Sequence, residues 1–318
     1  MKAIEIEKFG GPEVLRLVER PTPTAGPGTS LIEVNRAGVN YADTHQAEDS
    51  YLTPATLPLI PGGEVAGTTV DGRRVVALLP SGGYAQFAVA NDKTVFDLPD
   101  SIEDGQALAL VLQGVTAWHL LRTSARLSRG ETVVVHAGAG GVGLLAVQLA
   151  RLFGAGRVIA TASTEAKRTL ALELGADIAI GPDPAGLRDR LLEVNDDRKV
   201  DIVLEMTGGE TFDQSLRALA PFGRLVCYGQ ASRIPPTPVD PIKLMAGSRA
   251  VLGFWLGHCF GRPAELIGEP LRELFDLVRS GELRTVTGRE YPLSNASRAH
   301  EDLRARRTVG KLLLDPRR

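Results

Sequence analysis

Short runs of apolar residues, separated by proline- and glycine-rich turns, fill the first hundred positions of the chain. Turns such as PTPTAGPG and LPLIPGG interrupt the pattern before any run reaches helical length. The pattern therefore predicts an antiparallel, barrel-like unit. Its predicted strands are Ala3–Ile6, Leu31–Val39, Gly67–Val70, Arg74–Leu79 and Ala85–Val89.

The hydrophobic period changes after Asp100, where Ser101 and Glu103 open a run of helical spacing that reaches Leu120. Beyond it, short apolar strands alternate with amphipathic helices, which predicts a doubly wound parallel α/β sheet. The predicted strands are Val133–His136, Val158–Thr161, Ile178–Ile180, Ile202–Glu205 and Leu225–Gly229, and the helices Leu144–Phe153, Thr164–Leu174, Leu187–Val194 and Phe212–Leu219.

The last sixty residues return to a mixed pattern. Pro263–Ser280 has helical spacing, and Arg284–Pro316 predicts short strands around a helix at Ala296–Arg304. We expect this tail to rejoin the first unit.

Composition describes an ordinary globular chain. Its 318 residues suffice for about two domains, and 43% hydrophobic with 23% charged residues excludes a disordered chain. No apolar run reaches the roughly 18 residues that span a bilayer, and the start, MKAIEIEKFG, lacks the apolar block of a secretory peptide. We therefore expect a cytoplasmic protein whose chain begins at Met1, with no membrane partner.

Charge and cysteine usage exclude two further classes. The net charge of −2 is too balanced for the broad basic surface that nucleic acids attract, so no nucleic-acid partner is expected. The two cysteines, Cys227 and Cys259, can form neither a disulfide framework nor a zinc-binding pair.

The segment VVVHAGAGGVG carries the clearest local chemistry. A β-branched strand runs into Gly138, Gly140 and Gly143, and a helix follows. Glycines allow the tight turn and the close approach of strand, helix and pyrophosphate, and the helix N-terminus binds the phosphate charge. This order predicts a dinucleotide-binding loop rather than a packing turn alone.

The next strand ends at a group of polar and basic residues. Ser163 lies about 20 residues beyond the glycine motif, where an acid would bind a ribose 2′-hydroxyl. The sequence there is TASTEAKR, with Ser163 and Thr164 as neutral donors and Lys167 and Arg168 one turn into the helix. This group suits a 2′-phosphate and predicts NADPH rather than NADH, although Lys167 and Arg168 also fit a solvated helix face.

An ordered set of motifs resembles the medium-chain dehydrogenase/reductase superfamily, and within it the zinc-independent, zeta-crystallin-like quinone oxidoreductase branch. The resemblance covers nearly the whole chain. Its motifs are AGVNYAD (Ala37–Asp43), PGGEVAG (Pro61–Gly67), LQGVTAWHLL (Leu112–Leu121), HAGAGGVG (His136–Gly143), STEAKR (Ser163–Arg168), FGRLVCYGQAS (Phe222–Ser232), GFWL (Gly253–Leu256) and VGKLLLDP (Val309–Pro316).

This resemblance implies a fold and an assembly. It implies a GroES-like, mostly antiparallel β-barrel catalytic domain built from residues 1–113 and 258–318, and a Rossmann domain from residues 114–257. It also implies a nicotinamide in the cleft between the domains and a homodimer, and the apolar run Val251–Leu256 is suited to extend the sheet across a twofold axis.

Two positions bear on the reaction. Zinc-dependent relatives carry a cysteine where this chain has Asn40 and a histidine where it has Gly63, and neither replacement provides a thiolate or imidazole ligand. We therefore expect no metal. Without a Lewis acid, hydride acceptors that already delocalise negative charge are favoured, such as a quinone or an α,β-unsaturated carbonyl compound.

Site residues follow from the matching motifs. The resemblance places Asn40 beside the nicotinamide ribose or the reacting carbonyl, with Tyr51 in the substrate pocket and His45 where the family has another tyrosine. A family tyrosine near the adenine phosphate is replaced at about Gly181. The implied cofactor contacts are Asn40, Thr116, Gly140, Gly141, Val142, Gly143, Ser163, Lys167, Tyr228, Gly229, Phe254 and Lys311.

Several alternatives stay open. His45, Tyr51 or water could protonate the reduced product, whereas His45 and Tyr51 could equally be loop side chains without a role. As whole-protein functions, an enoyl-thioester or 2-alkenal reductase and a non-catalytic, NADPH-binding structural or RNA-binding relative compete with the small-molecule quinone or enone reductase.

Overall fold

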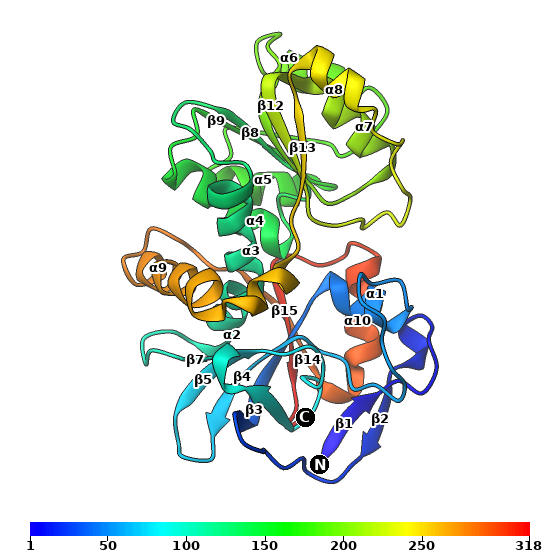
Figure 1. The fold of residues 1–318 in the computed structure, drawn as a ribbon, viewed down its shortest axis with the longest axis vertical. Coiled ribbons are helices and arrows are strands. Elements are labelled where there is room, and N and C mark those ends of the chain that lie inside the picture. The colour runs from blue at the N-terminus through cyan, green and yellow to red at the C-terminus, as the bar shows by residue number, and fades with distance from the viewer. The chain divides into compact units, whose positions relative to one another are not determined.

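The computed structural model describes residues 1–318, which form two compact units (Figure 1). The first unit comprises Met1–Val115 and Cys259–Arg318, and the second comprises Thr116–His258. Two chain segments far apart in sequence therefore fold together, and the intervening segment folds as a body of its own. None of the helices combines the length and the apolar character that a membrane span requires.

A seven-stranded, mostly antiparallel sheet dominates the first unit. The main strand order is β14-β15-β3-β4-β5-β7, β6 also pairs with β3, and β1 and β2 form a separate antiparallel pair. Only β14 and β15 pair in parallel. The strands are β1 (Lys2–Glu5), β2 (Arg16–Glu19), β3 (Thr29–Val39), β4 (Glu64–Thr69), β5 (Arg74–Leu78), β6 (Phe87–Asn91), β7 (Val95–Asp97), β14 (Thr287–Pro292) and β15 (Lys311–Asp315).

Strand β3 is central because it pairs with β4, β6 and β15. In β15 every side chain is buried, so the tail of the chain completes the core of the first unit rather than lying on its surface. Leu312 pairs with Val39 at the end of β3, which brings the start of β15 beside Asn40. The main hydrophobic core includes Ile32, Val65 and Leu314.

Helices of the first unit are short, with at most 11 residues. Helix α1 was not predicted, because the side chains it buries are Asp43, Thr44 and Ala47, which form no apolar stripe. Asp43 stabilises its start by accepting a hydrogen bond from the Asn40 amide at 2.8 Å. The helices are α1 (Tyr41–Ala47), α2 (Asp104–Leu108), α9 (Glu269–Arg279) and α10 (Ala296–Arg304), with π-helical turns at Ala109–Gly114 and Ala264–Gly268 and 3-10 turns at Pro12–Val14, Asp92–Thr94 and Leu293–Asn295.

The second unit holds a six-stranded, fully parallel sheet in the order β10-β9-β8-β11-β12-β13. This is the doubly wound Rossmann order, in which the first and fourth strands lie side by side. The first three strands extend the sheet to one side of this point and the last three extend it to the other side. The strands are β8 (Thr132–Val135), β9 (Arg157–Thr161), β10 (Ile178–Ile180), β11 (Val200–Glu205), β12 (Leu219–Cys227) and β13 (Ala250–Gly253).

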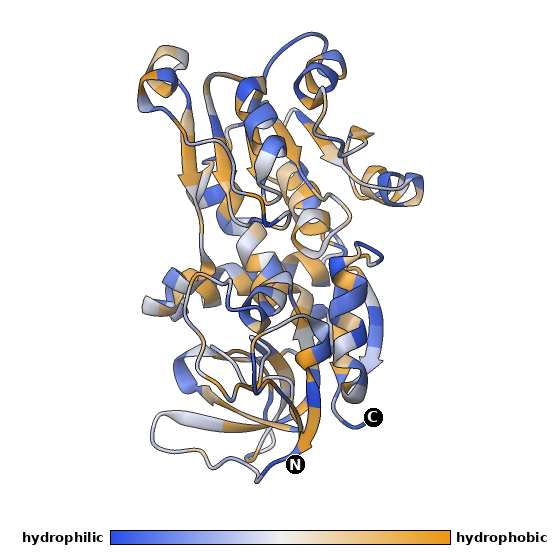
Figure 2. Cartoon of the chain, turned by 90° about the vertical axis from the view of Figure 1, so that its right-hand side faces the viewer, coloured by the Kyte–Doolittle hydropathy of each residue, from blue (hydrophilic) through white to orange (hydrophobic).

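Apolar strands of this sheet are enclosed by amphipathic helices, as the hydropathy colours of Figure 2 show. Val134, Ile159 and Val203 are fully buried in the core between sheet and helices. The helices are α3 (Val115–His119), α4 (Gly141–Leu152), α5 (Glu165–Glu173), α6 (Leu187–Glu193), α7 (Gly209–Ala218) and α8 (Pro241–Gly247), with a π-helical turn at Leu120–Ser124 and a 3-10 segment at Leu256–Gly261.

Several predicted boundaries differ from the structure. Ala85 makes an isolated bridge to Ala3, so β6 starts only at Phe87. Strand β4 begins three residues before Gly67 because Glu64 pairs with Leu78. The helix predicted from Ser101 begins at Asp104. The short strands β2 and β7 were not predicted, and β13 covers only the first part of the apolar run Val251–Leu256.

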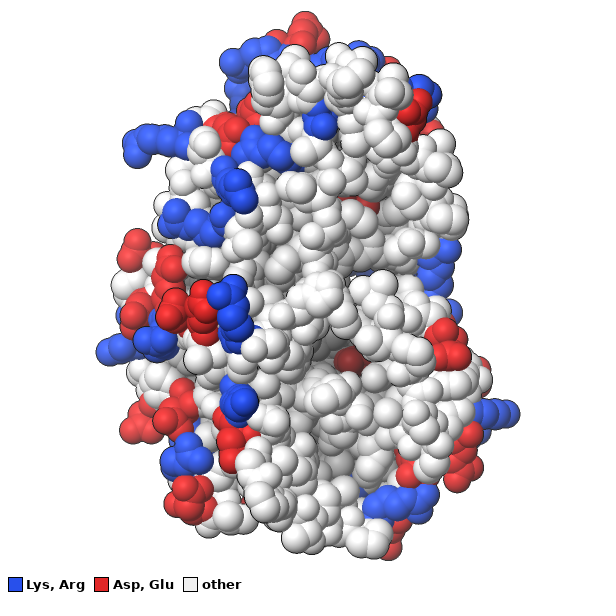
Figure 3. All heavy atoms as spheres, viewed as in Figure 1, with Lys and Arg blue, Asp and Glu red and all other residues white.

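Figure 3 shows Lys and Arg side chains interspersed with Asp and Glu side chains mainly around the margins of the drawn face.

Candidate functional site

The turn between β8 and α4 needs glycine at two positions. A Cβ at Gly143 would lie 2.2 Å from the Ala137 carbonyl oxygen, and one at Gly138 would lie 2.8 Å from the Ala160 Cβ. Both contacts are shorter than atoms tolerate, so strand β8, helix α4 and strand β9 approach one another only because these side chains are absent.

The N-terminus of α4 offers unpaired amides. Gly140 caps the helix in an extended conformation, and Gly141, Val142 and Gly143 form its first turn, where amide groups have no acceptor within the helix. No acidic side chain lies in that turn, and Gly141 and Val142 are half-exposed. The arrangement fits a diphosphate, because the amides and the helix dipole both favour negative charge there.

The end of β9 and the start of α5 form a second polar group. Ser163 is exposed, and Thr164 caps α5 by accepting a hydrogen bond from the Lys167 amide at 3.3 Å. The Arg168 guanidinium folds back to donate to the Ala162 carbonyl at 3.2 Å. A hydroxyl, two basic side chains and a helix N-terminus therefore lie at one strand end, which fits a phosphate better than a ribose diol.

Glu205 is the last residue of β11, which pairs with β8 at the point where the strand order of the sheet reverses. It is fully buried, and Oε1 accepts hydrogen bonds from the amides of Thr207 at 2.7 Å and Gly208 at 3.0 Å. Burial nevertheless raises the pKa of its carboxyl to about 7, although these amides oppose the shift. Glu205 stabilises the turn that starts α7.

Tyr228 and Gly229 follow β12 at the same edge of the sheet. The Tyr228 amide donates to the Glu205 carbonyl at 2.9 Å, and burial raises the pKa of the Tyr228 hydroxyl. Gly229 is exposed, and a Cβ there would lie 3.2 Å from the Met206 Cβ. The loops after β11 and β12 are thus packed together at the carboxyl ends of the strands, where ligands of this fold class bind.

His136 is buried directly after β8. Its Nδ1 lies 3.1 Å from the Thr161 hydroxyl and its Nε2 lies 2.8 Å from the Ser215 hydroxyl. Burial lowers its pKa to about 4, so the ring is neutral at physiological pH. It links β8, β9 and α7.

Thr116 and Phe254 lie elsewhere in the second unit. Thr116 is mostly buried in α3, three residues before His119. Phe254 follows β13, and its ring stacks on the His119 ring with centroids 5.5 Å apart. Trp118 packs edge-on against His119. The structure thus holds Phe254 in place through an aromatic cluster.

Asn40 lies in a buried polar cluster of the first unit, together with Glu64, Gln113 and Lys311. Its Nδ2 donates to Glu64 Oε1 at 2.8 Å, and its Oδ1 accepts from Gln113 Nε2 at 3.1 Å and Lys311 Nζ at 3.0 Å. Lys311 also forms an ion pair with Glu64, and neither side chain is exposed. Lys311 therefore contacts Asn40 directly and is enclosed, and the cofactor contact implied for both residues stays a prediction.

A second series of buried hydrogen bonds starts at the backbone amide of Asn40. Asp43 accepts from the Asn40 amide and from the Tyr84 hydroxyl at 2.8 Å each, and the Tyr84 hydroxyl lies 3.1 Å from His300 Nε2. Burial raises the pKa of Asp43 to about 6 and lowers that of His300 to about 4. These residues fix the backbone at the start of α1.

Sequence reasoning missed Glu64, Gln113, Tyr84 and His300. Two signals were available. Glu64 begins the apolar strand EVAGTT, and Gln113 lies inside an apolar helical run. Polar residues in such places are buried and need hydrogen-bond partners. Tyr84 and His300 lie 216 positions apart, and no local pattern relates them.

His45 and Tyr51 are half-buried in and after α1. His45 Nδ1 lies 2.9 Å from the Ser50 hydroxyl, and its ring lies 5.6 Å from that of Tyr41. His45 is thus held by local contacts, and the substrate-pocket roles of both residues stay predictions.

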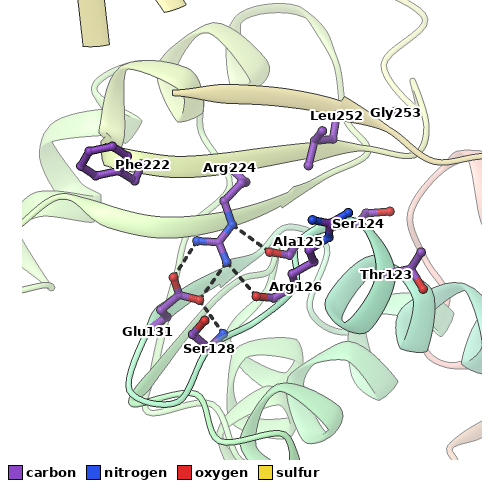
Figure 4. A pocket seen from close by; sticks show the side chains of 10 residues that line it. All are labelled: Thr123, Ser124, Ala125, Arg126, Ser128, Glu131, Phe222, Arg224, Leu252 and Gly253. Atoms are coloured by element: carbon purple, nitrogen blue, oxygen red, sulfur yellow. Dashed lines mark hydrogen bonds and ion pairs between the residues drawn. The ribbon is translucent and has the colours of Figure 1, made fainter. Parts of the chain in front are cut away.

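A cavity of about 560 Å³ in the second unit contains none of the predicted site residues (Figure 4). Arg224 forms its polar floor, donating to both carboxylate oxygens of Glu131 at 2.6 and 2.9 Å and to the carbonyls of Ala125 and Arg126. The guanidinium is therefore occupied by protein partners, and the floor is structural. No group of three or more His, Cys, Asp and Glu side chains is arranged to hold a metal ion.

Comparison with known proteins relates the whole chain to one family. The sequence matches the alcohol dehydrogenase GroES-like domain over residues 26–100 and the zinc-binding dehydrogenase family over residues 141–272. It is 35% identical to a quinone oxidoreductase of Pseudomonas aeruginosa, with 99% of each chain covered.

Two solved structures extend this similarity to the fold. A mycobacterial protein complexed with NADPH is 39% identical with a TM-score of 0.93, covering 99% of this chain and 100% of its own. The quinone oxidoreductase of Escherichia coli complexed with NADPH is 34% identical with a TM-score of 0.92 at the same coverage. The chain therefore belongs to the quinone oxidoreductase branch of the medium-chain dehydrogenase/reductase superfamily and is an oxidoreductase.

Proposed function

We propose that this protein is an NADPH-dependent, zinc-independent reductase that transfers hydride to a quinone or an α,β-unsaturated carbonyl compound. The observation that carries the proposal is the pair of phosphate-binding groups in the second unit. Both lie at carboxyl ends of adjacent parallel strands, β8 and β9, and the NADPH complexes of two relatives agree with this assignment.

Named residues would hold the cofactor. Gly140, Gly141, Val142 and Gly143 would bind the diphosphate through backbone amides, and Ser163, Lys167 and Arg168 would bind the 2′-phosphate. An acid at position 163 would repel that phosphate, whereas Ser163 is uncharged, and the nearest acid along the chain is Glu165 in the first turn of α5. Bound NADPH supplies the hydride for the reduction. We further assign Thr116, Tyr228, Gly229 and Phe254 to the nicotinamide half.

Metal independence is supported by the partners of Asn40. Its Oδ1 already accepts from the Lys311 ammonium group, which would repel a divalent cation, and Gly63 has no side chain to donate. The residues at these two positions do not fit zinc. Acceptors that delocalise charge themselves, such as quinones and enones, need no such ion.

The chain's own residues contribute positioning, and either one of them or a water molecule supplies a proton. Asn40 is held rigidly enough to orient a bound ligand, since both ends of its carboxamide are engaged. Hydride addition leaves an electron pair on the acceptor oxygen, which a proton must neutralise. We assign this proton to His45, Tyr51 or water.

The test is NADPH oxidation, followed by absorbance, with a panel of quinones and a panel of enones and enoyl thioesters. Turnover of quinones or simple enones supports the proposal, and turnover of enoyl thioesters alone favours a carrier-bound substrate. Tight NADPH binding without oxidation by any acceptor would contradict the enzymatic role and favour a non-catalytic relative.

We also propose a homodimer that works in the cytoplasm. The edge strand β13 pairs on one side only in the second unit. Three exposed apolar side chains lie in the two elements that precede it: Phe222 in β12 is 80% exposed, and Ile242 and Met245 in α8 are 65% and 71% exposed. Pairing of two copies would cover apolar surface and an open edge together. A sedimentation mass of one chain would contradict it.

A further inference from the structure

The direction of the Asn40 carboxamide is fixed by two partners whose roles cannot be exchanged. Lys311 Nζ can only donate, so the Asn40 atom that faces it at 3.0 Å is the oxygen. The carboxylate of Glu64 accepts, so the atom that faces it at 2.8 Å is the nitrogen. Exchange of the two ends would place donor against donor and acceptor against acceptor.

This arrangement uses all the acceptor capacity of Asn40. Oδ1 receives hydrogen bonds from both Lys311 and Gln113, which occupies its two lone pairs. Lys311 has no spare proton either, because its ammonium group donates to Asn40, Glu64 and the Val39 carbonyl. Asn40 therefore retains one amide proton and can act toward a ligand only as a donor.

The direction of Gln113 follows from that of Asn40. Since Gln113 Nε2 faces the Asn40 oxygen, its own Oε1 points elsewhere, and this buried atom has no hydrogen-bond partner. Gln113 is 9% exposed and Asn40 is 4% exposed. A buried acceptor without a donor costs free energy, so its retention beside Asn40 calls for a donor from outside the chain.

We propose that Gln113 recognises a ligand hydroxyl through Oε1, and that Lys311 and Glu64 act as positioning residues that leave Asn40 as a donor to the same ligand. A carbonyl oxygen only accepts hydrogen bonds, whereas a hydroxyl also donates. Two hydroxyl sources fit this chemistry. One is the quinol or enol that forms when hydride adds to carbon and the displaced electron pair on oxygen takes up a proton; the other is a ribose hydroxyl of the dinucleotide.

The quinol source rests on the proposed function, and binding measurements separate the two sources without requiring turnover. Calorimetry would give the Kd of NADP⁺ for the free protein, and the Kd values of hydroquinone and hydroquinone dimethyl ether for its NADP⁺ complex. The ether accepts hydrogen bonds but cannot donate. The variant Gln113→Met keeps the length of the side chain and removes the Oε1 acceptor, together with the Nε2 group that donates to Asn40. Gln148→Met, at a buried glutamine of the second unit, is the control.

If the hydroxyl belongs to the quinol, the wild type binds hydroquinone about ten-fold more tightly than the ether, and Gln113→Met abolishes the difference while the Kd of NADP⁺ is unchanged. If it belongs to the ribose, Gln113→Met weakens NADP⁺ binding about ten-fold. Gln148→Met should change none of these values. If Gln113→Met leaves both NADP⁺ binding and the discrimination between phenol and ether unchanged, the inference is wrong.

Two controls keep the test decisive. Should Gln113→Met fail to fold, Gln113→Asn withdraws the acceptor by one methylene and preserves polarity, and the same changes are expected. The double variant Lys311→Met/Glu64→Gln removes the two charges that orient Asn40 without leaving either unpaired; the phenol preference should fall in it as well. A protein that reduces neither quinones nor enones but loses NADP⁺ affinity in Gln113→Met would contradict the proposed function and support the hydroxyl site.

Discussion

Asn40 Oδ1 accepts a hydrogen bond from Lys311 Nζ at 3.0 Å, although the two residues lie 271 positions apart in the chain. The contact exists because β15 pairs with β3, so that the residue before Leu312 reaches the residue after Val39. The tail of the chain thereby supplies a charged group to the polar cluster around Asn40, and the direction of the Asn40 carboxamide depends on it.

Substitution of Gly143 by alanine should destabilise the second unit, because the new Cβ would overlap the Ala137 carbonyl. We expect the free energy of unfolding to fall by about 1–3 kcal/mol and NADPH binding to weaken markedly. Urea unfolding and fluorescence titration measure the two effects. Gly26→Ala is the matched control, since a Cβ there meets no atom within 4 Å; equal losses in both variants would refute this account of the glycine turn.

Lys167 and Arg168 should determine the preference between the two dinucleotides. Replacement of both by alanine removes the cations near Ser163, so the Kd of NADPH should rise about 10- to 100-fold while that of NADH changes little. Arg217→Ala, at an exposed position on α7, should alter neither value. An equal loss of affinity for NADPH and NADH would show that the pair acts on folding rather than on the 2′-phosphate.

The variant Glu205→Gln should change the pH dependence of stability. Burial raises the pKa of this carboxyl from 4.5 to about 7 in the folded protein. Between these values the folded state binds more protons than the unfolded state, so Glu205 makes the wild type less stable as pH rises, up to about pH 7.

The glutamine variant lacks that contribution. Its stability relative to the wild type should therefore increase from pH 5 to pH 7 by about 1–3 kcal/mol and then level off. Because Asp43, His136 and His300 titrate in both proteins, they cancel in the comparison. Urea unfolding at several pH values gives the difference; a constant offset would mean that Glu205 stays ionised in the folded protein throughout.

His45→Phe tests the source of the proton. If His45 protonates the reduced product, kcat should fall about 10²-fold or more with at least one quinone or enone, while the Kd of NADPH is retained. Steady-state rates over the acceptor panel give the answer. An unchanged kcat with every acceptor would leave Tyr51 or water as the donor.

Much of the fold could be predicted because its signals are local. The strand and helix alternation after Asp100 and the glycine turn before α4 are each readable within about a dozen residues, and the parallel sheet of the second unit confirms them. The elements α1 and β7 were missed because they bury few apolar side chains: α1 buries Asp43, Thr44 and Ala47, and none of the three residues of β7 is buried.

The polar interior could not be predicted in the same way. Glu64, Gln113 and Lys311 lie on a strand, a helical turn and the last strand, and only tertiary pairing brings them to Asn40. The family resemblance drew attention to Asn40 and Lys311 as cofactor contacts, which stay predictions, and it did not indicate that the two side chains contact each other. Gln113 and Glu64 were not recognised as site residues because their hydrogen-bond partners lie on other elements.

The central claim is that the protein uses NADPH, and calorimetric titration of the purified wild type with NADPH and with NADH tests it most directly. The account predicts one site per chain, with NADPH bound at least about ten-fold more tightly than NADH. Absence of heat and of fluorescence change with either dinucleotide, or a preference for NADH, would contradict it.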